Sequence, residues 1–282
     1  MRKRAGLWLL LLPLLLSGCG ALHAPAETAD PYAGMVQVES GYGTQMWVKE
    51  YEELEVNPFL DPAVYQDYAG TDYRLLPGVD VSEHQGEIDW AKLHGSGVEF
   101  AILRAGYRGY GQAGRLREDA RFKKNMEGAT AAGMQLGVYF FSQAVSPEEA
   151  EEEADFLLEL LAPYGPSAFA LPVFYDWEDI SHDEARTDGL DGETVTQCAL
   201  AFCARIAEAG YRPGVYAYRY LAYYCYELPR LRDAALWIGA INDYPDFYYA
   251  HEFWQYGLAE NVPGVSGAVD VDVWFRKQAG EE

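Results

Sequence analysis

The chain has 282 residues, of which half are hydrophobic, 15% are aromatic and 23% are charged. This composition excludes wholesale disorder and fibrous repeats, and the length allows one large α/β barrel or two smaller domains. The formal charge of −23 argues against binding to nucleic acid or adsorption to an anionic membrane surface, because both need an exposed basic face.

The first 18 residues have the pattern of a secretory signal. Residues 2–4 are basic, residues 7–16 are apolar, and small residues follow. The apolar stretch is too short to span a bilayer comfortably. Residues 16–19, Leu-Ser-Gly-Cys, resemble the bacterial lipobox, which would make Cys19 the lipidated first residue of the mature chain. An ordinary signal peptide with a chance cysteine is the alternative. We expect an exported lipoprotein, anchored to the outer face of the bacterial cell membrane through Cys19.

Residues 19–76 lack a regular pattern and are predicted to be a tether or linker. Residues 20–30 are rich in Ala, Pro and Glu, which is typical of a flexible leader. Some β-like alternation in residues 35–38 and 46–48 allows one short β-hairpin, and an acidic patch covers residues 50–55.

From residue 76 onwards, short apolar runs alternate with helical stretches, which is typical of βα units around a parallel sheet. The strongest helix is 146–161, where Ser146 and Glu149 form a capping box. Further helices are expected at 117–132 and 193–209. The last three strands lie too close together for helices between them, which indicates an incomplete (β/α) barrel. The predicted strands are 78–82, 98–105, 135–142, 171–177, 213–218, 236–241, 252–256 and 269–274.

The strongest chemical signal is a pair of acids at the end of an apolar strand. Asp176 and Glu178 are two residues apart, so they share one face of the strand with Cα atoms about 6–7 Å apart. Active sites of α/β barrels are built at this end of the strands. A solvated acidic loop that caps the next helix is the alternative. It explains Asp179 but not Asp176, which follows four largely apolar residues.

Two other strands also carry acids in apolar surroundings. Asp80 interrupts one strand, and Asp270 and Asp272 share one face of another, opposite valines. Paired carboxylates, one acting as an acid and one as a base or stabiliser, are the usual catalytic groups of glycoside hydrolysis. Aromatic residues near strand ends suit the faces of sugars, although each could equally belong to the core. These are Tyr139, Tyr175, Trp177, Tyr216, Trp237 and Trp254.

Other chemistries have weaker signals. The five histidines lack zinc-helix spacing, the pair Asp80 and His84 is weak as a metal site, and there is no G-x-S-x-G elbow. The glycine-rich stretch 106–111 lacks a P-loop lysine and is better explained as a mobile loop. We therefore expect no metal and no cofactor. After lipidation three cysteines remain, and a Cys203–Cys225 bridge and buried free thiols both stay open.

Taken together, these segments resemble the family 25 glycoside hydrolases, which are lysozymes (N-acetylmuramidases). The resemblance implies an α/β fold, an irregular TIM-like barrel of five βα units followed by three β-strands, over residues 77–276, with residues 277–282 as a tail. It also implies cleavage of the β-1,4 bond between N-acetylmuramic acid and N-acetylglucosamine in peptidoglycan. The matching segments are 78–86, 88–90, 100–107, 137–139, 172–179, 253–256 and 269–272.

The resemblance also implies roles for single residues. Glu178 takes the place of the general acid, and Asp176 that of an ionised partner that stabilises the reacting sugar or its N-acetyl group. Asp80 and Asp270 complete the acidic set. Trp177 is bulkier than the usual residue there and is expected to point away from the cleft. Gln85, Tyr139 and Gln255 match positions that line the cleft in the family. From their places near strand ends, rather than from the resemblance, we also expect four further substrate-binding residues: Tyr175, Tyr216, Trp254 and Asp272.

Two functions from other classes compete with a muramidase. One is a non-catalytic glycan- or solute-binding lipoprotein on the same fold, and the other is a deacetylase. Four convergent carboxylates are costly to bury and favour an enzyme, and the missing histidine cluster disfavours a deacetylase. We expect a monomer whose partners are peptidoglycan glycan strands and, through the lipid anchor, the membrane.

Overall fold

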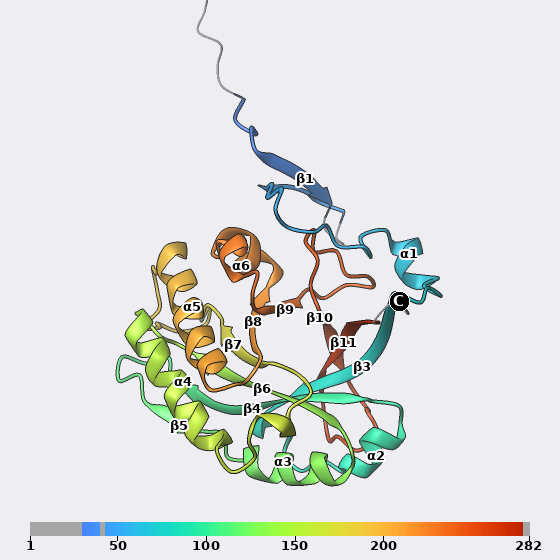
Figure 1. Cartoon of the computed structure of the whole chain (residues 1–282), viewed down its shortest axis with the longest axis vertical. Helices are drawn as coiled ribbons and strands as arrows, with labels where there is room; N and C mark the ends of the chain where they lie inside the picture. The colour runs from blue at the N-terminus through green and yellow to red at the C-terminus, as the bar shows by residue number, and fades with distance from the viewer. Residues whose placement is uncertain (1–29, 40–42, 279–282) are drawn as a thin grey trace, which may run out of the picture. The chain divides into compact units, whose positions relative to one another are not determined.

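The computed structural model describes residues 30–39 and 43–278 (Figure 1). The chain divides into two units, residues 1–33 and residues 34–282. The predicted signal peptide and Cys19 lie outside the described residues. Within the described part of the chain, no helix is long and apolar enough to cross a membrane.

Eight strands of the larger unit close into a barrel. Seven consecutive strands are parallel, and the last is antiparallel to both of its neighbours, so it joins the seventh strand to the first. All eight correspond to strands predicted from the sequence. In their order around the barrel they are β3 (Tyr73–Val81), β4 (Phe100–Arg108), β6 (Gln135–Ser142), β7 (Val173–Trp177), β8 (Pro213–Tyr218), β9 (Ala235–Gly239), β10 (Phe253–Ala259) and β11 (Val269–Lys277).

Helices follow the first five barrel strands and are missing after the last three within the described residues. This confirms the expected barrel of five βα units followed by three strands. Figure 1 shows α3, α4 and α5 on the outside of the strands. The five helices are α2 (Trp90–Gly95), α3 (Phe122–Ala131), α4 (Pro147–Leu161), α5 (Gly192–Glu208) and α6 (Arg219–Tyr224).

The predicted start of helix 117–132 is wrong. Residues Leu116–Glu118 form a short strand, β5, which pairs antiparallel with the end of β4. β3 pairs with β4 only as far as Leu103, so the end of β4 still has free hydrogen-bonding groups on that edge. Asp119 then ends the strand, because its carboxylate accepts hydrogen bonds from the amides of Arg121 (2.9 Å) and Glu83 (3.0 Å).

Alternation along the strands produces two apolar layers, one inside the barrel and one between the strands and the helices. On β7, Phe174 lies in the inner layer and Tyr175 in the outer one. Gly78 faces inward, where a Cβ atom would come within 2.2 Å of the Phe100 ring, so the glycine makes room for that ring. The inner layer consists of Leu76, Phe100, Ile102, Tyr139, Leu171, Phe174, Tyr216, Ala235, Trp237, Phe253 and Trp274.

Residues 45–60 pack against the barrel, and we call this segment the collar. It begins with β2 (Gln45–Lys49), which pairs with β1 (Met35–Glu39) in an antiparallel hairpin. The Asn57 side chain donates to the carbonyls of Pro245 (2.7 Å) and Phe247 (3.0 Å), and Ala250 N–H donates to Glu55 O (2.8 Å). The collar, which lies within the segment expected to be a tether, is therefore fixed to the loop between β9 and β10.

The described cysteines are Cys198, Cys203 and Cys225, and all three are free thiols. Burial raises the pKa of Cys198 and of Cys203 to about 12. Of the two alternatives that the sequence left open, the structure favours buried thiols.

Candidate active site

A cavity of about 310 Å³ opens at the end of the barrel where the parallel strands finish. Four acids from three strands meet in it: Asp80 from β3, Asp176 at the end of β7, Glu178 just after β7, and Asp270 at the start of β11. The remaining lining residues are Tyr139, Tyr216, Tyr218, Trp237, Ile241 and Gln255.

Strand register explains why these acids converge. Asp270 of β11 lies directly opposite Asp80 of β3, so both side chains emerge on the same face. Asp272 lies one step deeper, opposite Gly78, and is fully buried. The indole N–H of Trp237 donates to Asp272 Oδ1 at 2.9 Å, which fixes this carboxyl below the cavity floor.

A chain of hydrogen bonds crosses the cavity from β8 to β3. The hydroxyl of Tyr216 donates to Gln255 Oε1 (2.8 Å), and Gln255 Nε2 donates to Asp80 Oδ2 (2.8 Å). The amide contact partly opposes the rise in the pKa of Asp80 that burial causes, because a donor favours the charged carboxylate. Tyr216 and Gln255 thereby hold Asp80 in one orientation.

Burial dominates the electrostatics of the acids. It raises the pKa of Asp80 to about 8 and that of Glu178 to about 7. Negative neighbours add to this effect: Asp270 acts on Asp80, and Asp179 acts on Glu178. The cavity therefore retains protons on its carboxyl groups near neutral pH.

Asp176 lies in strongly desolvating surroundings. Burial holds its pKa well above the usual range, the charges of Glu178 and Asp80 raise it further, and the charge of Arg104 opposes them. Its Oδ1 atom is buried and has no hydrogen-bond partner. These surroundings oppose the ionisation of Asp176, and its ionised state stays a prediction.

Tyr139, Tyr216 and Gln255 lie beside the acids, where the sequence placed them, and Asp272 lies beneath. Gln85 does not line the cavity. Its Oε1 accepts from Ser82 N–H (2.9 Å), and its Nε2 donates to Ala268 O (3.4 Å). Its amide therefore holds two backbone segments together at the rim.

Tyr175 and Trp254 point away from the cavity, which corrects their assignment to substrate binding. The ring of Tyr175 lies 5.3 Å from that of Phe202 on α5. Trp254 stacks on Phe275 at 6.5 Å and donates its indole N–H to Ala240 O at 2.8 Å. Each is a neighbour in sequence of an inward-facing residue, so strand alternation sends it to the outer layer. Trp177 belongs to the same outer layer, as expected.

Three lining residues were missed by the sequence argument: Trp237, Tyr218 and Ile241. Trp237 was noted only as an aromatic residue near a strand end. Its ring lies 4.6 Å from that of Tyr216, so the two form one aromatic wall. Alternation along β9 from inward-facing Ala235 could have identified it.

A buried clasp holds the backbone of Glu178 from behind. Gln143 Nε2 donates to the carbonyl oxygen of Glu178 (3.0 Å), while Gln143 Oε1 accepts from the hydroxyl of Thr187 (2.9 Å). The amide of Gln143 donates to Glu153 Oε1 (3.3 Å). Both ends of the loop that follows β7 are thereby attached to the same side chain.

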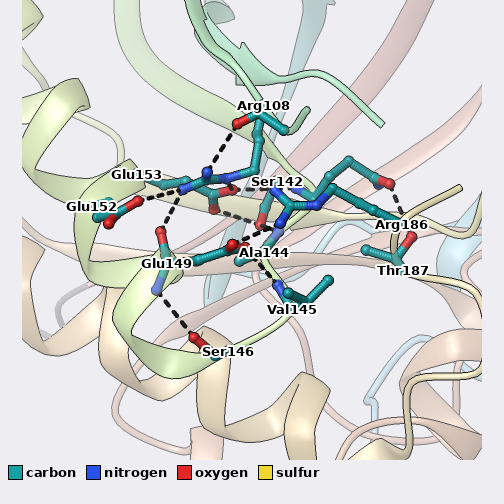
Figure 2. Close-up of polar contacts among 12 residues, drawn as sticks. Arg108, Ser142, Ala144, Val145, Ser146, Glu149, Glu152, Glu153, Arg186 and Thr187 are labelled. Carbon is teal, nitrogen blue, oxygen red and sulfur yellow. Dashed lines mark hydrogen bonds and ion pairs between the residues drawn. The ribbon is translucent and has the colours of Figure 1, made fainter. Parts of the chain in front are cut away.

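The clasp rests on a buried ion-pair network, which Figure 2 shows between β4, β6 and α4. Arg108 Nε donates to Glu153 Oε1 (2.7 Å), and the hydroxyl of Ser142 donates to Glu153 Oε2 (2.6 Å). Arg186, from the loop after β7, pairs with Glu149 at 2.6 Å. Because removing one partner would leave a charge buried alone, this network is costly to disturb.

Across the described residues, no group of three or more His, Cys, Asp or Glu side chains is arranged to hold a metal ion. The cavity therefore offers carboxyl groups, a hydrogen-bonded amide and an aromatic wall.

The sequence model of Glycosyl hydrolases family 25 matches residues 79–265, which is more than half of the chain. The chain belongs to glycosyl hydrolase family 25. The match contains Asp80, Asp176 and Glu178, and ends just before Asp270.

Several known proteins resemble this chain. Autolytic lysozyme of Clostridium acetobutylicum is 24% identical over 199 residues, which are 70% of this chain and 55% of that protein. Lysozyme M1 of Streptomyces globisporus is 27% identical over 212 residues, which are 69% of this chain and 66% of that protein. This chain thus spans between half and two thirds of the length of the curated relatives that it matches. The modular autolysin LytC of Streptococcus pneumoniae, also solved with a synthetic peptidoglycan ligand, has 26% identity. Its TM-score is 0.62, and the alignment covers 86% of this chain and 57% of LytC.

Proposed function

We propose that this family 25 protein is a peptidoglycan hydrolase that cleaves the β-1,4 bond between N-acetylmuramic acid and N-acetylglucosamine. The observation that carries the proposal is the convergence of Asp80, Asp176, Glu178 and Asp270 in one cavity beside an aromatic wall. Relatives named as lysozymes and an autolysin, one of them solved with a peptidoglycan ligand, support it.

In the proposed reaction Glu178 is the general acid, which protonates the departing glycosidic oxygen. A pKa of about 7 suits this role, because the carboxyl group keeps its proton up to neutral pH. Positive charge that develops at the anomeric carbon favours the ionised form of a neighbouring carboxyl. In the proposed reaction Asp176 acts in its ionised form and stabilises the positive charge or the N-acetyl group. Asp80, held by Gln255, and Asp270 complete the polar floor.

The test compares Glu178→Gln and Asp176→Asn with the wild-type protein on purified peptidoglycan. We expect Glu178→Gln to lose at least about a hundredfold in turnover, the scale of general acid catalysis, while it still binds wall fragments. Asp176→Asn should also lose turnover without losing binding. Glu184→Gln, an exposed change in the loop after β7, is the matched control. Mass analysis of the products identifies the bond that is cut.

Two results would contradict this proposal in different ways. If Glu178→Gln keeps near-native turnover, the proton donor must be sought among Asp80, Asp176 and Asp270. If the wild-type protein binds glycan strands but creates no new reducing ends, the non-catalytic binding protein becomes the better description.

We also propose that the protein is exported and anchored to the membrane through a lipid on Cys19, with residues 77–276 as the hydrolase domain. Cys19→Ser should release the protein from the membrane fraction. An uncleaved signal would mimic retention, so the intact mass of the mutant must be measured as well. Retention of a mutant with a cleaved signal would refute the lipid anchor.

A further inference from the structure

A second cavity, of about 360 Å³, lies at the end of β4. Among its lining residues are Arg104, Tyr107 and Arg117, which form a row that we call the arginine groove. The guanidinium carbon of Arg104 lies 5.2 Å from the centre of the Tyr107 ring. Tyr107 of β4 and Arg117 of β5 are directly paired, so their side chains share a face.

The chain around the arginine groove is locally rich in arginine. Residues 100–117 contain four arginines and no acidic residue, in a chain with a formal charge of −23. Arg108 is buried and paired with Glu153 and Glu152. Arg115 and Arg117 are exposed, and neither forms an ion pair with another described residue. Of these two, only Arg117 lines the cavity.

Arg104 and Arg117 have different parts in the groove. Arg104 is fixed by Asp119 (2.8 Å) and Glu83 (3.3 Å), so its charge is already partnered, and it holds the ring of Tyr107. Glu83 is the acidic member of the lining. Arg117 keeps its guanidinium available, and this group suits a carboxylate because it can donate two parallel hydrogen bonds.

Arg104 also connects the groove to the acidic cavity. It is in register with Tyr139 of the neighbouring strand β6, and Tyr139 lines the acidic cavity. Burial raises the pKa of Asp176, and the charge of Arg104 opposes this effect. Because β4 and β6 are neighbours in the barrel, a sugar chain in the acidic cavity would lie about one strand away from the groove.

Building on the proposed function, we propose that the arginine groove binds a free carboxylate of the peptide attached to muramic acid. Muramic acid carries this peptide on its lactyl ether, and the peptide has carboxylates that a bare glycan lacks. Arg117 pairs with the carboxylate, and Tyr107 supports the peptide backbone. The enzyme then prefers glycan strands that carry peptides over strands from which the peptides have been removed.

The test measures kcat/KM on two substrates made from the same peptidoglycan, one with peptides and one stripped of them. Wild type should favour the peptide-bearing strands. In Arg117→Gln this preference should fall about fivefold, mainly through KM, which is the scale of one exposed charge pair. Arg115→Gln, a matched exposed arginine outside the cavity, should keep the wild-type preference. Amidation of the peptide carboxylates should reduce the wild-type preference in the same way.

Two outcomes would overturn the proposal that the arginine groove binds a peptide carboxylate. An equal loss of kcat/KM on both substrates would mean that Arg117 acts on the glycan or on the fold, and an unchanged preference would mean that it binds no peptide. A wild-type protein that cleaves neither substrate would refute the proposed function instead. The groove is then tested by the affinity for a soluble muramic acid fragment that carries its peptide. This affinity is compared between the single variant Glu178→Gln and the double variant that also carries Arg117→Gln.

Discussion

Replacing Glu178 by glutamine is expected to stabilise the folded protein above neutral pH. The pKa of the Glu178 carboxyl rises from the ordinary 4.5 to about 7, chiefly because of burial. A carboxyl with a raised pKa binds its proton more tightly in the folded state than in the unfolded state. The free energy of unfolding therefore falls as the pH rises from about 4.5 to about 7, and it stays lower above that range.

The size of the effect follows from the two pKa values. Their difference of roughly 2.5 pH units corresponds to about 3 kcal/mol. This is an upper limit, because Glu178 is only half-buried and its neighbours titrate with it. Glutamine keeps the shape of the protonated side chain but cannot ionise. The free energy of unfolding of the variant should thus match that of wild type at pH 4 and exceed it by up to about 3 kcal/mol at pH 8.5.

Urea unfolding followed by circular dichroism at both pH values measures this difference. Glu184→Gln, an exposed glutamate on the same loop, is the control and should match wild type at each pH. A Glu178→Gln protein that is no more stable than wild type at pH 8.5 would refute the reasoning, because the carboxyl would then carry no desolvation cost. The expected result combines lost turnover with gained stability, as is common when an active-site group is removed.

Three further results are expected. Turnover should fall as the pH rises through about 7, and Asp179→Asn should move this limb of the pH–rate profile to lower pH, because the Asp179 charge raises the pKa of Glu178. Gln143→Ala should lower the urea midpoint and turnover, since buried polar groups left without partners cost about 1–3 kcal/mol each. Cys198 and Cys203 should react with a thiol reagent at neutral pH only after unfolding, because burial raises the pKa of both thiols to about 12.

The barrel strands could be predicted because each is a short apolar run bounded by glycine or proline. The start of α3 could not, since Leu116–Glu118 suits a helix as well as a strand, and only the open edge of β4 decides between them. The collar also has little signal in the sequence. It is held largely by hydrogen bonds to backbone carbonyls, such as those that Asn57 makes, and these need no hydrophobic period.

The candidate active site also contains residues that could be predicted from the sequence and residues that could not. Asp80, Asp176 and Asp270 could be found because an acid among apolar residues is conspicuous on a strand. Tyr175 and Trp254 were misassigned because nearness to a strand end was weighed without the side of the strand that each residue faces. The clasp of Gln143 on Glu178 joins residues 35 positions apart and depends on tertiary packing. No local pattern could have predicted it.

The packing of the collar would also limit how far a protein lipidated on Cys19 could reach from the membrane. If Cys19 carries the lipid, the longest possible spacer runs from Cys19 to Gly34, at the start of the larger unit. Fifteen residues span at most about 50 Å when fully extended, whereas a free tether to residue 76 would span about 200 Å. A lipidated protein would then reach less far from the membrane than a free tether would allow, and lengthening this spacer would extend that reach.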